Sequence, residues 1–343
     1  MLSCQNEQPN TTVVDENVDV VLTVKAPQMN DTRSGGSNID SGLGAIDNFD
    51  NNTELWDDYD LRYILEIYEV KTEENATTTS DEPIYERQVL TTDRYVDNSV
   101  NFKMQLVPNR TYKFVIWADF VTQGSTEDLH YDTTDLHAIS RKQSVAHIAM
   151  EETLDAYHIS STEKIRNSTN ISLTLKRPFA KLRVVAIDHN EIVGYSTPTN
   201  VVVKFDTEHN PIYKTFNAIN NEISNTCTTH EYEKYSVNPA PYKEYSATTD
   251  KGENITGLVL FSDYILAQRD GQQPVSFSMD IYDENNAPIR SLDFETQIPI
   301  CRNHLTTIVG YCLTKKETII VNINDTLLSN DEFNKDAEDV TQE

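Results

Sequence analysis

Apolar and polar side chains alternate along many short segments of this chain. From Val18 to Val24 the apolar side chains recur at every second residue, and the same holds from Val100 to Leu106. Successive side chains of a β-strand point to opposite faces, so this pattern is typical of strands with one buried face. Other segments with this alternation are Ile171 to Leu175, Leu182 to Ala186, Val201 to Phe205, Val275 to Ile281 and Ile319 to Ile323.

A turn follows directly after the segment that ends at Leu106. The residues Pro108-Asn109-Arg110 reverse the chain, and alternation resumes from Tyr112 to Ile116. Because Pro and Asn favour turns, we expect an antiparallel hairpin here. Helical spacing is best met between Ser144 and Tyr157, where we expect one short amphipathic helix.

Strands dominate this prediction. No long stretch keeps the apolar spacing of a helix, and 343 residues suit two domains that each bury a core. We therefore expect an all-β chain of two sandwich-like domains. The polar segments Asn30 to Asp60 and Asn220 to Asp250 are expected to form long surface loops, and Thr326 to Glu343 an acidic, solvated tail.

The chain is strongly acidic. It has 55 Asp and Glu residues against 28 Lys and Arg residues, a formal net charge of -27. Such a charge repels phosphate backbones, so nucleic acid is not an expected partner. No uninterrupted apolar run approaches the ~18 residues of a membrane-spanning helix, so we expect any membrane contact to depend on a lipid or a partner.

Five stretches occur in the same order as in one known family. They are Val20 to Val24 followed by Thr32-Arg33, Arg62 to Tyr68, Arg110 to Asp119, Leu175 to Leu182, and Ile298 to Thr314. Taken together they resemble the fimbrillin-like surface lipoproteins of Bacteroidales, the superfamily that includes the type V pilus subunits. This resemblance implies two tandem transthyretin-like (Greek-key) β-sandwich domains, export as a lipoprotein and a place at the cell surface.

The resemblance also implies the limits of the domains. In that family the strand near Leu175 opens the second domain, so we place the boundary near Asn170. The expected organisation is a lipoprotein tether over residues 1–17, an N-terminal sandwich over 18–170, a C-terminal sandwich over 171–325 and an acidic tail over 326–343.

The start Met1-Leu2-Ser3-Cys4 resembles the mature start of a bacterial lipoprotein. A small residue precedes the cysteine, and a polar run follows it until Val18. On this interpretation Cys4 carries a lipid that anchors the protein in the outer membrane, facing the cell surface. Only three residues precede Cys4, and the alternative is an ordinary thiol in a polar terminus.

Pilus relatives assemble by strand exchange. A protease cuts after an arginine, the first strand leaves, and a strand of the next subunit completes the sheet. Arg33 is the matching residue, in a polar segment after the first alternating strand; the alternative is a plain loop residue. The tail beyond Asp325 has few apolar residues among its acids and is a poor donor strand, which favours an accessory or tip component of a fimbrium, or a free-standing surface protein.

Catalysis and cofactors are not expected. The sequence has no Gly-x-Ser-x-Gly elbow, phosphate loop or His-Glu-x-x-His motif. Oxygen and imidazole ligands do crowd one segment after Trp117, which makes it a candidate site for a divalent ion, with a solvated acidic loop as the alternative. The candidate ligands there are Glu127, Asp128, His130, Asp132, Asp135 and His137.

The other cysteines leave two alternatives open. Either Cys301 and Cys312 form a disulfide in an oxidising envelope and Cys227 stays free, or all three are buried thiols.

Two functions of different class remain. The first is structural or adhesive: a tethered protein with pilus subunits as partners. The second is a binding module for a glycan or a host protein, with the two long polar segments as its recognition surface.

Overall fold

The computed structural model describes residues 17–27, 58–73, 76–93, 98–145, 148–191, 198–228, 230–236, 244–248, 254–314 and 319–324. Within these residues the regular structure is almost entirely β-strand, so the predicted all-β class is confirmed. The described helical elements are the short 3-10 turns η3 (Gln143–Val145), η4 (Glu152–Leu154) and η5 (His189–Glu191). No helix in the described part of the chain has the length and apolar character needed to cross a membrane.

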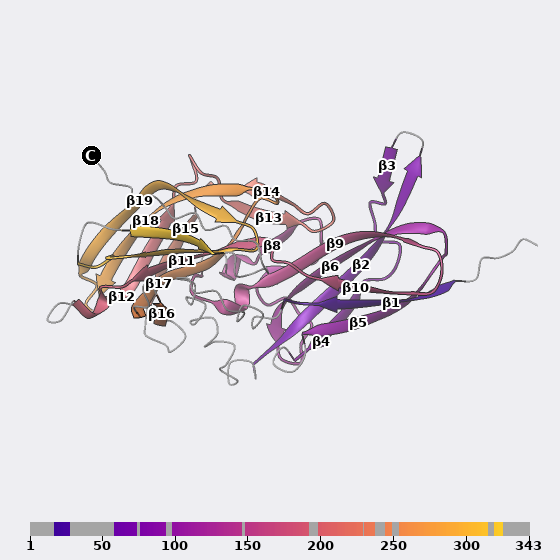
Figure 1. Ribbon diagram of the computed structural model, residues 1–343, viewed down its shortest axis with the longest axis horizontal. Coiled ribbons are helices and arrows are strands. Elements are labelled where there is room, and N and C mark those ends of the chain that lie inside the picture. Colours follow the sequence, from indigo (N-terminus) through magenta and orange to yellow (C-terminus); the bar gives the residue numbers. More distant parts are fainter. Residues whose placement is uncertain are drawn as a thin grey trace, which may run out of the picture.

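The N-terminal half forms a sandwich of two sheets (Figure 1). The first, named the β1 sheet, has the strand order β10-β1-β5. The second, named the β2 sheet, has the order β3-β2-β6-β9, with β4 also paired to β2. The strands of both sheets are β1 (Val18–Lys25), β2 (Tyr59–Glu73), β3 (Ala76–Thr79), β4 (Gln88–Thr92), β5 (Ser99–Leu106), β6 (Arg110–Thr122), β9 (Ala156–Ile165) and β10 (Thr169–Thr174).

The C-terminal half forms a second sandwich. Its β11 sheet has the order β21-β20-β11-β17-β13-β8-β7, with β14 on β13 and β16 on β17, and its β12 sheet has the order β15-β12-β18-β19. The strands of the β11 sheet are β7 (Tyr131–Asp132), β8 (Ile139–Arg141), β11 (Phe179–Ala186), β13 (Tyr213–Asn217), β14 (Glu222–Thr226), β16 (Glu244–Thr248), β17 (Asn254–Leu266), β20 (Leu305–Gly310) and β21 (Ile319–Asn324). Those of the β12 sheet are β12 (Pro198–Phe205), β15 (His230–Ser236), β18 (Gln272–Asp283) and β19 (Pro288–Cys301).

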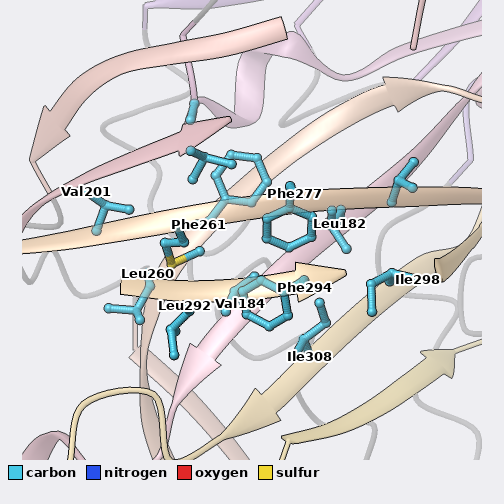
Figure 2. Packing of buried hydrophobic residues seen from close by; sticks show 14 of the residues in the cluster. Leu182, Val184, Val201, Leu260, Phe261, Phe277, Leu292, Phe294, Ile298 and Ile308 are labelled. Atoms are coloured by element: carbon cyan, nitrogen blue, oxygen red, sulfur yellow. The ribbon is translucent and has the colours of Figure 1, made fainter. Parts of the chain in front are cut away.

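Each sandwich encloses its own apolar core. Figure 2 shows the core of the second sandwich, where Leu182 and Val184 of β11 face aromatic rings from β17, β18 and β19. The rings of Phe277 and Phe294 stack with their centroids 4.5 Å apart. This is the close interdigitation expected of the facing sides of a sandwich.

A third core joins the two sandwiches. Along β2, Tyr63 and Leu65 point into the first sandwich, whereas Ile64 and Tyr68 point to the opposite face and pack against residues of the β11 sheet. Neighbouring β6 alternates in the same way, and Trp117 belongs to the junction side. The β2 sheet is therefore covered on both faces over much of its length, which explains why β6 has a nearly continuous apolar sequence.

The chain crosses between the halves more than once. β7 and β8 come from the N-terminal half, yet they extend the β11 sheet, and Ile139 of β8 pairs with Phe216 of β13. β10 is the last strand to pair with β1, and β11 then opens the second sandwich. The two sandwiches are thus joined by strand pairing as well as by packing.

Three local expectations were wrong. The antiparallel hairpin expected on either side of Pro108-Asn109-Arg110 does not form, because β5 belongs to the β1 sheet and β6 to the β2 sheet. The described residues of Ser144 to Tyr157 contain no α-helix; they contain a short turn at each end of the stretch and then the start of β9. Tyr157 pairs with Ala118 of β6, so tertiary pairing overrides the local helical spacing. The polar segment Asn220 to Asp250, expected to be a long surface loop, contains β14, β15 and β16.

Candidate functional site

β1 is the central strand of the β1 sheet. Residues Val18–Lys25 are paired in register with antiparallel β5. On the other side, Val20 to Lys25 are paired in register with parallel β10. The backbone of β1 is thus hydrogen-bonded on both sides, and its removal would leave the facing edges of β5 and β10 unpaired.

Three apolar side chains of β1 fill the core of the first sandwich. Val20, Leu22 and Val24 are each at most 1% exposed, and they belong to the same cluster as Tyr63 of β2 and Phe114 of β6. The residues between them are at least partly exposed. A strand in this position therefore needs apolar side chains at alternate positions on one face and tolerates polar ones on the other.

The end of β1 is fixed by further hydrogen bonds. The amide of Ala26 donates to the carbonyl of Asn98 at 2.9 Å, and the side-chain amide of Asn98 donates back to the carbonyl of Ala26 at 2.9 Å. The amide of Leu175 donates to the carbonyl of Lys25 at 2.8 Å. β1 is therefore held up to its last residues, immediately before the predicted cleavage segment.

The two residues predicted to be processed, Cys4 and Arg33, lie outside the described residues. The tether over 1–17 ends just before β1, and the described segment after β1 ends at residue 27. Lipidation at Cys4 and cleavage after Arg33 stay predictions.

The acidic segment after Trp117 packs on the face of the β2 sheet that points to the junction of the two sandwiches. Arg62 of β2 forms a bidentate ion pair with Asp119 of β6, with distances of 2.8 and 2.9 Å, and contacts the carboxylate of Asp128 at 2.9 Å. Asp128 also accepts hydrogen bonds from the backbone and hydroxyl of Thr133, at 3.0 and 2.7 Å. Burial raises the pKa of Asp128, but the bonds from Thr133 and Arg62 outweigh it and lower the pKa overall. Through its contact with Arg62, Asp128 therefore holds this segment against the β2 sheet.

Of the five other candidate ligands, only Asp135 and His137 have side chains in contact, with Nδ1 of His137 3.0 Å from a carboxylate oxygen of Asp135. Glu127, His130 and Asp132 do not join them. His130 is buried, and its Nε2 lies 2.7 Å from the hydroxyl of Thr153. Asp132 accepts a hydrogen bond from the amide of Thr134, whereas Asp135 accepts one from the amide of His137. Among the described residues, no group of three or more His, Cys, Asp or Glu side chains is arranged to hold a metal ion.

No disulfide involves Cys227, Cys301 or Cys312 in the structure. Cys312 is buried, and burial followed by the nearby Asp188 carboxylate raises the pKa of its thiol to about 12. Cys227 and Cys301 are half-buried. The disulfide between Cys301 and Cys312 is therefore not formed in the structure, and the alternative of three buried thiols holds only for Cys312.

Sequence analysis identified the strand but not its surroundings. The alternation from Val18 to Val24 predicted β1, and that from Ile171 to Leu175 overlaps β10. It did not reveal that β10 is the parallel neighbour of β1, because no local signal connects residues so far apart in the chain.

Three solved structures show distant likeness to this chain. A candidate polysaccharide-binding protein of Bacteroides thetaiotaomicron is 10% identical, with 90% of this chain and 97% of that chain covered and a TM-score of 0.42. A candidate cell adhesion protein of Bacteroides eggerthii is 14% identical, with 90% and 95% covered and a TM-score of 0.44. A fimbrial assembly protein of Parabacteroides distasonis is 11% identical, with 90% and 96% covered and a TM-score of 0.34.

No curated protein sequence matches the chain. One family model does, and it matches residues 10–343, which include all four sheets and the β1 site. The chain therefore belongs to the family described as "Family of unknown function (DUF6562)".

Proposed function

We propose that this protein is a non-catalytic, lipid-anchored protein of the cell surface that acts in adhesion or surface assembly by strand exchange. The observation that carries the proposal is the position of β1. It is the first described strand of the chain, the central strand of its sheet, and the source of three core side chains.

Release of β1 would create a specific acceptor. The facing edge of β5 would offer unpaired backbone groups opposite Val18 to Lys25, and that of β10 opposite Val20 to Lys25. The space left by Val20, Leu22 and Val24 would be lined by apolar residues such as Phe114. An incoming strand would gain its affinity from backbone hydrogen bonds and its register from three apolar side chains at alternate positions.

The other end of the chain supports an acceptor role. β21 is the last described strand, and it is paired with β20 along all of Ile319–Asn324. That strand already completes an edge of its own sheet. The acidic composition of residues 326–343 makes that segment a poor donor strand, which favours an accessory or tip component that accepts a strand.

The surface location is also part of the proposal. It rests on the resemblance to fimbrillin-like lipoproteins and on Cys4 as the lipidated residue. Mass spectrometry of the protein isolated from its native membrane tests it: we expect an acylated Cys4 at the amino end of the mature chain. A mature native protein that starts elsewhere, or that carries an unmodified Cys4, would exclude lipid anchoring.

The strand-exchange part is tested with a specific protease site placed after Arg33. The cleaved protein is incubated with a labelled peptide that spans residues 17–27, and the labelled complex is separated by size-exclusion chromatography. We expect the peptide to replace the native strand and to form a complex that resists dissociation. The uncleaved protein is the first control, because its tethered β1 competes at high effective concentration.

A second peptide with Leu22→Asp is the matched control. It keeps the length and the other side chains but places a charge in the buried position of Leu22. We expect no complex with this peptide. The proposal is wrong if the cleaved protein stays folded and binds neither peptide, or if it binds both equally.

A further inference from the structure

A cavity of about 360 Å³ lies at the junction of the two sandwiches, apart from the β1 site. Residues of β6, β8, β11, β13 and β17 line it, so both halves of the chain contribute to it. Its volume falls near the lower end of the range for small-molecule sites in proteins.

The inner end of the cavity is aromatic. The ring of Trp117 lies edge-on to that of Tyr131, with centroids 5.4 Å apart, and 6.0 Å from that of Phe216. The three residues are at most 2% exposed, so they are held rigidly by the surrounding core. Aromatic edges and faces in this arrangement are complementary to another flat ring.

The outer end of the cavity is positively charged. Lys214 and Thr228 are exposed lining residues, and Arg141, which also lines the cavity, is partly buried. The guanidinium of Arg141 donates to the Asp263 carboxylate at 2.8 Å, which balances part of its charge. The lining residues, all within the described part of the chain, include no Asp or Glu.

Cys227 lines the same cavity as Lys214 and Arg141. Burial raises the pKa of its thiol, and the charges of Lys214 and Arg141 oppose that rise. In a protein with a net charge of -27, a cavity with two cations and no lining carboxylate is an exception to the overall composition. Anions would be repelled by most of the chain, so a local cationic site provides selectivity for them.

We propose that this cavity binds a small aromatic carboxylate, with the ring directed toward Trp117 and Phe216 and the carboxylate near Lys214. The exposed ammonium supplies the charge complement, and the buried rings supply the apolar contact. This site is independent of strand exchange at β1, because the two involve different cores.

The test uses phenylacetate as the probe and Trp117 as the reporter. The chain has two tryptophans, so a Trp56→Phe variant leaves Trp117 as the only one. We expect phenylacetate to change its fluorescence in a saturable way. Phenylacetamide, which has the same shape without the charge, should bind about fivefold more weakly, as expected for the loss of one exposed ion pair.

Two lysine variants in the same background separate the site from the general charge of the protein. Lys214→Met should weaken phenylacetate binding about fivefold. Lys103→Met removes an exposed lysine from β5, outside the cavity, and should leave binding unchanged. Saturable binding with this selectivity supports the proposal. No saturable change, equal binding of phenylacetamide, or equal effects of both variants would overturn it.

Discussion

Arg177 and Asp155 form a bidentate ion pair that is closed off from solvent between the two sandwiches. The guanidinium nitrogens lie 2.7 to 2.9 Å from the carboxylate oxygens, and the side chains are 4% and 0% exposed. Asp155 precedes β9 of the first sandwich, whereas Arg177 precedes β11 of the second. The hydroxyl of Tyr157 donates to the same carboxylate at 2.8 Å. One buried pair therefore links the two halves of the chain.

Removal of one partner of this pair should be costly. In an Arg177→Met variant the Asp155 carboxylate stays buried without its counter-charge, and we expect a loss of roughly 3–5 kcal/mol in the free energy of unfolding. Urea denaturation measures it. Arg110→Met is the control, because Arg110 forms an exposed ion pair with Glu69 and should cost less than about 1 kcal/mol. Equal losses in the two variants would contradict a structural role for the buried pair.

Stability should fall in mild acid because of two buried histidines. Burial lowers the pKa of His158 to about 3, and it lowers that of His130 to about 4. Both values lie below the 6.5 of an unfolded histidine, so the unfolded chain takes up protons that the folded protein does not. The contribution of these histidines to the free energy of unfolding is complete above pH 6.5. It is lost as the pH falls toward 3 or 4, by roughly 1.4 kcal/mol per pH unit for each histidine.

The contribution of one histidine can be separated by substitution. The Nε2 of His158 lies 2.7 Å from the carbonyl of Ala218, a contact that the amide of a His158→Gln variant can replace. Urea denaturation between pH 6.5 and 4.5 should show a shallower loss of stability in this variant. His209→Gln removes only an exposed contact with Asp206, because the His209 side chain is 74% exposed, and should change the slope less than His158→Gln does. An unaltered slope in His158→Gln would show that His158 does not titrate as expected.

The packing of β1 can be tested without any exchange. Leu22 is fully buried. Leu22→Ala should lower the free energy of unfolding by about 2–5 kcal/mol because it removes apolar contacts and leaves a cavity. Lys25→Ala, at the exposed end of the same strand, should change stability by less than about 0.5 kcal/mol. Thermal and urea denaturation of both variants measure the difference. Similar costs at both positions would mean that β1 is not packed as described.

Gly257 marks a close approach between β17 and β11. A Cβ atom at this position would lie 2.5 Å from Cγ1 of Val185 and 3.0 Å from the carbonyl oxygen of Ala186. We expect Gly257→Ala to lower the free energy of unfolding by about 1–3 kcal/mol because of this overlap. The control is Thr256→Ala at the exposed neighbouring residue, with a change below about 0.5 kcal/mol in urea denaturation. A Gly257→Ala variant as stable as the parent would show that the strands separate easily here.

Much of the strand content was predictable because it depends on local alternation. The two strands predicted from Val100 to Ile116 appear as β5 and β6, and the turn between them places Asn109 at φ 65, but the strands belong to different sheets and do not form a hairpin. Asn tolerates this left-handed conformation better than most residues, which is the physical basis of the turn signal. A pattern of period two detects the strands that have one buried face.

The junction between the sandwiches was not predictable in the same way. Trp117 and Phe216 meet there only after the chain has folded, and no spacing in the sequence relates them. The same holds for the acidic segment: Asp128 was a candidate metal ligand by composition, whereas its actual partner, Arg62, lies on a distant strand. Composition identifies which groups are available, but only the tertiary fold determines their partners.

The double covering of the β2 sheet has a consequence for how the molecule opens. Ile116 faces one core and Trp117 faces another, and both are fully buried. Solvent deuterium can reach their backbone amides only after an adjoining layer has separated and the pairing of β6 with β2 or β9 has opened. We therefore expect the centre of β6 to exchange its amide protons last, so that departure of the first strand would leave the middle of the protein intact.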